Sequence, residues 1–345
     1  NMRTYIFTSV VCLFLMCLSY QGASGVYIVF TLFCAFRMWK KNEIKTSAVI
    51  QFCVISALCY LVTLGLFKLL FVEKIADDIY VSTSTSASSI ISNVRQYVSV
   101  LWNDFGHSSV KIFMCAAAVV FVIQQTAVSF RNKFASVFCA VLLLALSAVL
   151  SYGAYLALSR PLLAPRAYMG FCSFACCILL SVISDSGTHI KPLSFISNAC
   201  CFICLYSFYV FAFTYGNVQK YQSEYADFRA HLLINNLKTV LPQNGSAVEL
   251  HFSNDIGIAP AVQNAAAVYP VIKSGFIAGY LSSDDRSSQY VLFSYGLGTL
   301  KEGTSENKQN MALYPVVSED CYTKIQASDS KYLITFKTPD FKVIK

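Results

Sequence analysis

Hydrophobic residues dominate the first 216 positions of the chain, where they form long runs separated by short polar turns. A bilayer has a hydrocarbon core about 30 Å thick and an α-helix rises about 1.5 Å per residue, so roughly 17 to 25 apolar residues make one crossing. This pattern predicts seven crossings, at residues 4–20, 22–38, 47–72, 110–130, 134–158, 167–184 and 193–216. The first two meet at Tyr20 and Gln21, which predicts a tight helical hairpin or one bent, partly re-entrant unit.

The rest of the chain, residues 217–345, has no run of this length. Apolar residues at steps of three and four first continue the last helix to about Val240, and Pro242 and Gly245 then stop it. Short strand-like runs follow at 247–252, 268–273, 289–295, 322–327 and 332–337, and a helix is expected at 259–267. The predicted fold is an α-helical polytopic membrane protein with a transmembrane domain at 1–216 and a small C-terminal α/β domain at 217–345.

Residues 73–109 form the longest loop between predicted crossings. After a Ser/Thr run, apolar residues from Ile90 to Leu101 recur at helical spacing, which predicts an amphipathic helix. Arg95, Tyr97 and Trp102 suit a helix that lies along the membrane surface, where basic and aromatic side chains settle. The alternative is an ordinary loop that packs on the helical bundle.

Composition supports a membrane protein, because 56% of the residues are hydrophobic and only 13% are charged. The net charge of +8 does not indicate a nucleic-acid partner, since twelve basic and twelve acidic residues cancel in 217–345. Most of the excess lies in alternate loops of the membrane part, which we interpret as cytoplasmic, and the opposite side has a net charge of only about +2. The basic residues of the cytoplasmic set are Arg3, Arg37, Lys40, Lys41, Lys45, Arg131, Lys133 and Lys191. The N-terminus is therefore expected inside and the C-terminal domain outside, with membrane lipids as partners.

Thirteen of the fourteen cysteines lie in the apolar runs, and only Cys321 lies in the polar domain. We interpret them as small apolar groups that pack between helices rather than as metal ligands or redox groups. The chain has no phosphate-binding loop, dinucleotide glycine fingerprint, nucleophile elbow or zinc-protease motif. We therefore predict no cofactor and no metal site.

The segment from Ser159 to Arg166 is the most distinctive outer turn, with two prolines and the two arginines Arg160 and Arg166. Guanidinium groups bind phosphate in a bidentate manner, so this pair is a candidate site for the phosphate of a lipid carrier. The alternative is that both side chains only reach toward ordinary anionic headgroups. Asp77 and Asp78 on the same side are weak candidates for a general base, although solvated loop acids are commoner.

Four short stretches resemble the bacterial Gtr-type O-antigen glucosyltransferase family. They are Leu18–Tyr27 with its Tyr-Gln turn, Pro165–Gly170, Tyr215–Tyr225 with its Gly-Asn segment, and Asn310–Pro315 followed by a strand near the end of the chain. Their order is similar to that of the C-terminal two-thirds of the family. The resemblance implies a multispanning protein of the bacterial inner membrane with a periplasmic C-terminal domain.

The resemblance also implies an enzyme that moves a sugar, most simply glucose, from a polyprenyl-phosphate donor to a lipid-linked polysaccharide acceptor such as O-antigen. Arg160 and Arg166 would then hold the donor phosphate, with Arg95 as a third candidate. The family places its essential acids in a first outer loop that precedes the matched region, and Asp77 and Asp78 stand in a later loop. We therefore expect a fragment that lacks the catalytic acidic loop.

Two other classes remain open from the sequence. The first is a non-enzymatic transporter or lipid-handling protein with an outer recognition domain, although the predicted crossings are almost free of charge and the two halves are not alike. The second is a structural assembly factor without activity.

Overall fold

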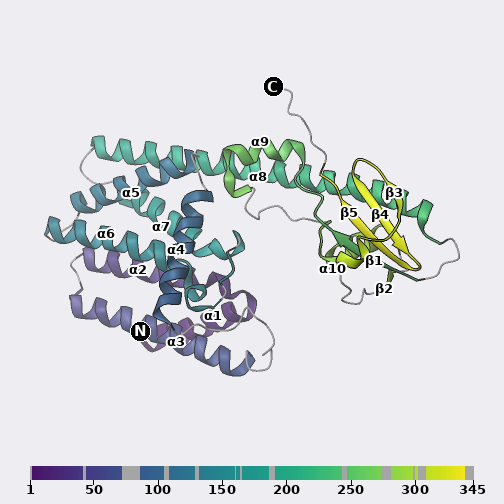
Figure 1. The fold of residues 1–345 in the computed structure, drawn as a ribbon. Helices are drawn as coiled ribbons and strands as arrows, with labels where there is room; N and C mark the ends of the chain where they lie inside the picture. Colours follow the sequence, from purple (N-terminus) through teal and green to yellow (C-terminus); the bar gives the residue numbers. More distant parts are fainter. Residues whose placement is uncertain are drawn as a thin grey trace. The chain divides into compact units, whose positions relative to one another are not determined.

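The computed structural model describes residues 2–41, 44–71, 86–104, 109–128, 132–159, 161–163, 165–185, 191–242, 247–272, 281–297, 300–301 and 308–338. The chain divides into two compact units, Asn1–Phe211 and Ala212–Lys345 (Figure 1). The sequence places the domain boundary after residue 216, five residues further along. The first unit is a helical bundle, and the second contains a sheet.

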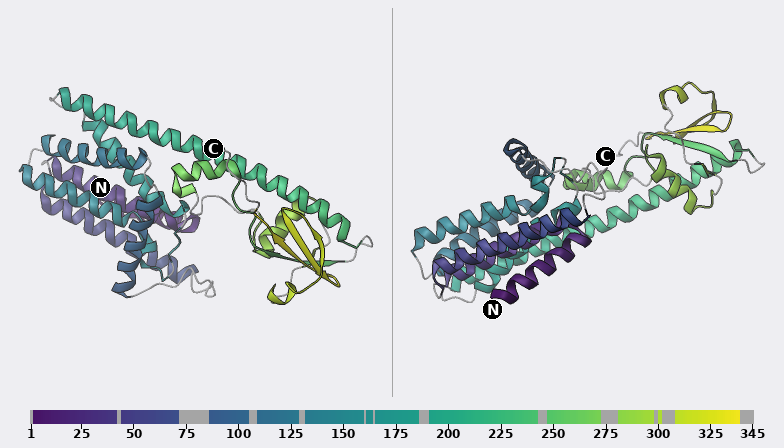
Figure 2. Two further views of the ribbon diagram at one scale, coloured as in Figure 1. Left: turned by 45° about the horizontal axis from the view of Figure 1, so that its top comes forward. Right: turned by 90° about the horizontal axis from the view of Figure 1, so that it is seen from below.

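Seven helices in the described ranges are long and apolar enough to cross a membrane. They are α1 (Met2–Ser19), α2 (Ser24–Lys40), α3 (Thr46–Phe71), α5 (Ser109–Val128), α6 (Lys133–Leu150), α7 (Met169–Asp185) and α8 (Lys191–Val240). Helix α2 lies at the centre and contacts α1, α3, α6 and α7, while α5 contacts α6 and α7 (Figure 2). Between α1 and α2 a short 3-10 turn, Gln21–Ala23, makes the tight hairpin that the sequence allows.

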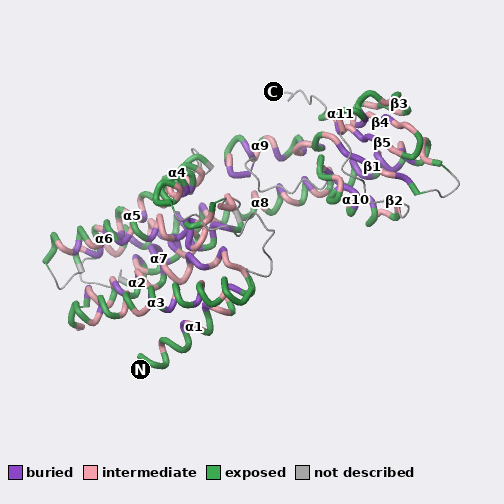
Figure 3. The backbone as a smooth tube through the Cα atoms, turned by 60° about the horizontal axis from the view of Figure 1, so that its bottom comes forward, coloured by how far each residue is buried: buried purple, intermediate pink, exposed green. Residues whose placement is uncertain are grey.

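The bundle has an apolar core and an apolar outer surface. Val29 and Phe33 of α2 pack with Phe121 of α5 and Ile178 of α7. On the outside, α3 exposes large apolar side chains along its length, for example Leu61 at 62% (Figure 3). A soluble protein rarely exposes continuous apolar surface of this kind, so the outer face is suited to lipid.

The prediction of one crossing over residues 134–158 is wrong at its end. Helix α6 stops at Leu150, and a 3-10 turn, η3 (Gly153–Ala157), follows. Gly153 has φ +59°, a conformation that interrupts a right-handed helix and that glycine adopts most readily. Residues 151–158 therefore belong to the end of the bundle.

The predicted amphipathic helix is confirmed as α4 (Ala87–Asp104). It contacts η3, so one of its faces packs on the bundle. Its other face exposes Ile91, Val98 and Trp102. The ammonium of Lys111, near the start of α5, lies 3.6 Å from the centre of the Trp102 ring.

The second unit contains a five-stranded sheet of order β2-β1-β5-β4-β3. Its strands are β1 (Val248–Ser253), β2 (Leu300–Lys301), β3 (Val316–Glu319), β4 (Thr323–Ser328) and β5 (Lys331–Phe336). Strand β1 runs parallel to β2 and β5, whereas β3, β4 and β5 are antiparallel neighbours. Apolar residues of α8 from Ala226 to Leu237 form one core with β1, β4 and β5.

Three helices complete this unit: α9 (Pro260–Val268), α10 (Asp285–Ser294) and α11 (Lys308–Met311). The predicted strands at 289–295 and 268–273 are wrong. The first is part of α10, whose start is capped by Asp284, since its carboxylate accepts a hydrogen bond from the Ser287 N–H. The second contains Pro270, which lacks an N–H for a strand ladder and begins a 3-10 turn, Pro270–Ile272. Strands β2 and β3 were not predicted.

Candidate functional site

One end of the bundle is built around the backbone of Ser151, just after α6. A Cβ atom added to Gly25 of α2 would lie 1.8 Å from the Ser151 carbonyl oxygen, and one added to Gly170 of α7 would lie 2.0 Å from it. A Cβ atom on Gly153 would meet the hydroxyl of Ser24 at 2.3 Å. Helices α2 and α7 and the turn after α6 therefore meet backbone to backbone, which only glycine permits. We call this meeting point the Ser151 junction.

Aromatic side chains pack over the Ser151 junction. Tyr97 of α4 stacks on Tyr152, with ring centroids 4.3 Å apart and planes inclined by 10°. The Ser151 hydroxyl donates to the carbonyl of Ala148 and lies 2.8 Å from the Tyr97 hydroxyl, which then acts as the donor between the two. The Tyr152 hydroxyl donates to the carbonyl of Leu162 at 2.8 Å. These contacts hold the segment that leads toward the predicted arginine turn.

Helix α4 is fixed at this end by Asn93 as well as by Tyr97. The buried Asn93 amide donates to the carbonyl oxygens of Leu156 and Leu158, at 3.0 Å and 2.8 Å. Asn93 and Tyr97 are one turn apart and share a face of the helix. Arg95 lies between them in sequence, so it is on the opposite face and exposed to solvent.

Arg166 lies in the 3-10 turn η4 (Pro165–Tyr168), which leads into α7. Ala167 and Tyr168 are buried, whereas Arg166 is exposed. The turn contacts both the Gln21–Ala23 turn and α7. The neighbours of Arg166 in the sequence thus anchor its backbone while its guanidinium remains accessible.

Tyr155 is close enough to Arg166 to respond to its charge. Burial raises the pKa of the Tyr155 hydroxyl strongly, the Tyr20 hydroxyl raises it further, and the Arg166 guanidinium acts in the opposite direction. Burial likewise raises the pKa of Tyr97 and Tyr152. These phenols stay protonated at neutral pH, so they can donate hydrogen bonds but cannot act as bases.

Two of the five predicted site residues, Arg166 and Arg95, lie in the described part of the chain. Arg166 lies at the Ser151 end of the bundle beside Tyr155, and Arg95 lies on the exposed face of α4. Asp77, Asp78 and Arg160 lie outside the described residues. The roles of all five stay predictions.

Comparison with known families identifies the chain. The family model described as "Glucosyl transferase GtrII" matches residues 1–176, about half of the sequence. The chain belongs to this family. No curated protein and no solved structure matches it. The matched region of this glucosyl transferase family member includes α4, the Ser151 junction and Arg166, whereas the sheet-containing unit lies beyond it.

The residues that build the Ser151 junction were not among the predicted site residues, although the sequence contains an indication of them. Gly25 and Gly170 lie within two of the stretches that carry the family resemblance, Leu18–Tyr27 and Pro165–Gly170. Tyr152 and Tyr155 have no such mark, because an aromatic residue at the end of a predicted crossing is usual at a membrane interface. Tyr97 was predicted to lie at that interface, whereas the structure buries it.

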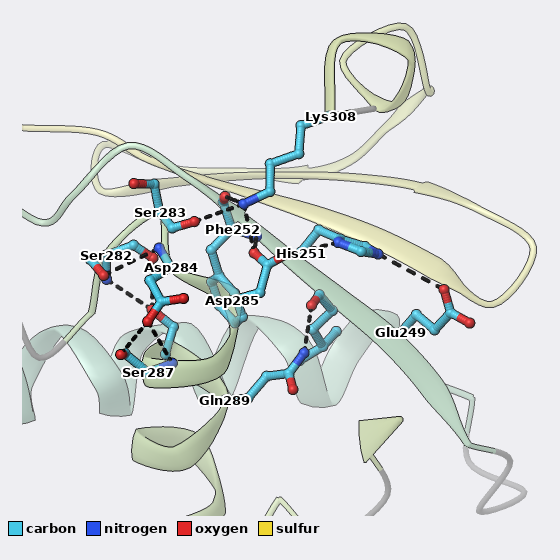
Figure 4. Close-up of polar contacts among 12 residues, drawn as sticks. Glu249, His251, Phe252, Ser282, Ser283, Asp284, Asp285, Ser287, Gln289 and Lys308 are labelled. Carbon is cyan, nitrogen blue, oxygen red and sulfur yellow. Dashed lines mark hydrogen bonds and ion pairs between the residues drawn. The ribbon is translucent and has the colours of Figure 1, made fainter. Parts of the chain in front are cut away.

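The second unit contains a polar network around Asp285 (Figure 4). One carboxylate oxygen of Asp285 lies 3.0 Å from Nδ1 of the buried His251. The other accepts from the Phe252 N–H at 2.7 Å and from Lys308 Nζ at 2.8 Å. Lys308 also donates to the carbonyls of Phe252 and Ser283.

This network completes the hydrogen bonding of β1. Strand β2 pairs only with Val248 and Glu249, at the start of β1. The later residues on this side of β1 therefore need other hydrogen-bond partners than β2. Gln289 donates to the Leu250 carbonyl there. The Asp285 carboxylate accepts from the Phe252 N–H, and Lys308 donates to the Phe252 carbonyl. Buried backbone groups require such partners, which gives the network a structural role.

A polar groove lies where the parallel strands β1 and β5 end. Its volume is about 750 Å³. Hydroxyl, amide and charged side chains dominate its lining, which comprises Ser253, Asn254, Asp255, Gly257, Ser283, Thr335, Phe336, Lys337 and Thr338. Ligands commonly bind beyond the carboxyl ends of parallel strands, so this groove is the candidate binding surface of the second unit.

Proposed function

We propose that this glucosyl transferase family member moves a glucosyl residue from a polyprenyl-phosphate donor to a lipid-linked polysaccharide acceptor, such as O-antigen, at the outer face of the bacterial inner membrane. The observation that carries the proposal is the exposed Arg166, whose turn packs on the Gln21–Ala23 turn and on α7 at an end of the bundle that lies within the family match. The charge pattern of the loops supports an outer location for this end of the bundle and for the C-terminal unit.

The proposed chemistry concerns the leaving group. When the bond between the sugar C1 and the phosphate oxygen breaks, negative charge develops on the polyprenyl phosphate. A fixed guanidinium stabilises that charge more than it stabilises the ground state, which lowers the barrier. Arg166 would supply this charge and the protonated phenol of Tyr155 a hydrogen bond. Arg160 would be a second phosphate ligand, and Arg95 a weaker third one.

A base is still required to take the proton of the acceptor hydroxyl. The phenols at the Ser151 end are unsuitable, because their pKa values are raised. Asp77 and Asp78, in the outer loop 73–109, are our candidates for this base.

The polar groove of the second unit would hold part of the acceptor. Saccharides present many hydroxyl groups, and the exposed Asn254, Asp255 and Ser283 offer donors and acceptors for them. This assignment is independent of Arg166, because it concerns another part of the chain.

Transfer from synthetic polyprenyl-phosphoglucose by the full-length protein in lipid vesicles tests the proposal. We expect Arg166→Ala to lower kcat about 100-fold or more, as loss of one transition-state charge contact does elsewhere, and Arg166→Lys to restore part of it. Arg286→Ala, which removes an exposed arginine of α10, is the matched control and should leave turnover unchanged. Unchanged turnover of Arg166→Ala would exclude the residue from the mechanism.

The proposed orientation has its own test. Cys321 is the exposed cysteine of the second unit and should react with a membrane-impermeant maleimide in intact spheroplasts. A cysteine placed at the exposed Lys133, at the opposite end of the bundle, should react only after permeabilisation. Protection of Cys321 until permeabilisation would overturn the orientation and the proposed function together.

A further inference from the structure

A second pocket lies at the other end of the bundle, between α2, α5 and α7. Helix α2 begins at Ser24 beside the Ser151 junction and ends at Lys40, so its last turn is about 25 Å from that junction at 1.5 Å per residue. The pocket has a volume of about 210 Å³. No role in the proposed transfer involves it.

The pocket combines cations, hydroxyl groups and apolar walls. Lys40 is 6% exposed, and its Nζ donates to the Gln125 side chain at 2.7 Å. Arg37 is exposed at the rim and donates to the Ser184 hydroxyl at 3.4 Å. Ser181 adds a second hydroxyl, and no carboxylate occurs among the described residues that line the pocket.

The rest of the lining is largely aromatic and aliphatic. Phe30, Phe36, Phe121 and Leu180 surround the polar end of the pocket. A free inorganic anion would gain nothing from these walls, whereas a lipid would place its phosphate against the cations and its chain against the apolar side chains. Basic pockets between membrane helices at headgroup level are the usual form of sites for acidic lipids.

We propose that this pocket binds the phosphate headgroup of an anionic membrane phospholipid, with Arg37 and Lys40 as its cationic ligands. The simpler reading is that both cations only offset the negative C-terminal end of α2, where such charges are favourable. That explanation needs neither the pocket nor its apolar walls and predicts no lipid binding. A binding measurement therefore distinguishes it from the proposed lipid site.

The test is a titration of the full-length protein, purified in a zwitterionic detergent, with phosphatidylglycerol, followed by native mass spectrometry. We expect saturable binding that weakens about fivefold in Arg37→Gln and again in Lys40→Gln, the effect of one cation near a headgroup. Arg37→Lys and Lys40→Arg should retain most of it. Lys133→Gln, an exposed lysine at the same end that does not line the pocket, should bind as the wild type does.

Two further probes identify the ligand. Phosphatidylcholine should bind at least fivefold more weakly than phosphatidylglycerol, and inorganic phosphate should not displace the lipid at an equal concentration. Equal binding of both lipids, displacement by phosphate alone, or unchanged affinity in Arg37→Gln would each overturn the proposal. Arg37 is exposed, so its variant keeps the test decisive if Lys40→Gln does not fold.

Discussion

The ring of Tyr97 in α4 lies flat against the ring of Tyr152 in the turn that follows α6, with centroids 4.3 Å apart. This contact joins a helix that is not one of the seven candidate crossings to the Ser151 junction. The same turn carries Tyr155, the neighbour of Arg166. The position of α4 and the surroundings of the proposed donor site are therefore linked through one short 3-10 turn.

Asn93→Ala should loosen α4. The substitution removes the two hydrogen bonds to the carbonyls of Leu156 and Leu158 and should weaken the docking of the helix by about 1–3 kcal/mol. Hydrogen exchange of the α4 amides should accelerate about tenfold or more. Asn103→Ala is the control on the same helix, since Asn103 is exposed and bonds only to Ser99 among the contacts described for it. Equal exchange in both variants would contradict the docking role of Asn93.

Gly25→Ala should destabilise the bundle, because the new methyl group would meet the backbone oxygen of Ser151 at 1.8 Å. Forced displacement of a packed backbone costs about 1–3 kcal/mol, and we expect a lower unfolding temperature in detergent. The control is Gly65→Ala in α3, where an added Cβ has no atom within 4 Å. That variant should gain up to about 1 kcal/mol from helix propensity. Similar melting of the two variants would show that α2 and the turn after α6 can separate without penalty.

Arg229→Lys should destabilise the second unit. Arg229 is 1% exposed, and its guanidinium donates to the Tyr225 hydroxyl and to the carbonyls of Ile256, Tyr322 and Lys337. The ammonium of a lysine cannot donate in all of these directions, so some buried acceptors lose their hydrogen-bond partner. Each such loss should lower the free energy of unfolding by about 1–3 kcal/mol. Faster hydrogen exchange across β4 and β5 should report the loss. Lys220→Met, at a side chain 70% exposed, is the control and should stay within about 0.5 kcal/mol of the wild type.

Acid should weaken the turn before β4 through Asp320. Burial would raise the pKa of its carboxyl, but hydrogen bonds from the Asn236 side chain and from the N–H groups of Thr323 and Tyr322 outweigh burial and lower the pKa below its ordinary 3.8. A lowered pKa in the folded state means that the stabilisation is present above pH 3.8 and is lost as the pH falls through the lowered value.

The corresponding measurement compares Asp320→Asn with the wild type from pH 6 to pH 2. The variant should be less stable at pH 6, and the difference should shrink as the wild-type carboxyl becomes protonated. Asp329→Asn, at an exposed aspartate in the β4–β5 turn, is the control. A constant difference across this range would exclude the titration of Asp320 as its cause.

The sequence predicts the crossings well because bilayer thickness sets a length that apolar runs must meet. It fails at residues 151–158, where apolar residues continue beyond the end of α6 and only Gly153 indicates the change of direction. Strand patterns in the second unit succeed for β1, β4 and β5 but not for 289–295, where the capping side chain of Asp284 favours a helix. The Ser151 junction could not be predicted, because contacts between backbones leave no side-chain pattern other than glycine.

The side chains of Gln289, Asp285 and Lys308 have one more consequence, which concerns encounters between molecules. An unpaired strand edge is a template for a strand from another chain, and proteins with such edges tend to aggregate. On β1 the backbone groups beyond β2 are already hydrogen-bonded from within the same molecule. This edge of the sheet is thereby protected against intermolecular strand addition, which favours solubility of the unit while the chain is being synthesised and inserted.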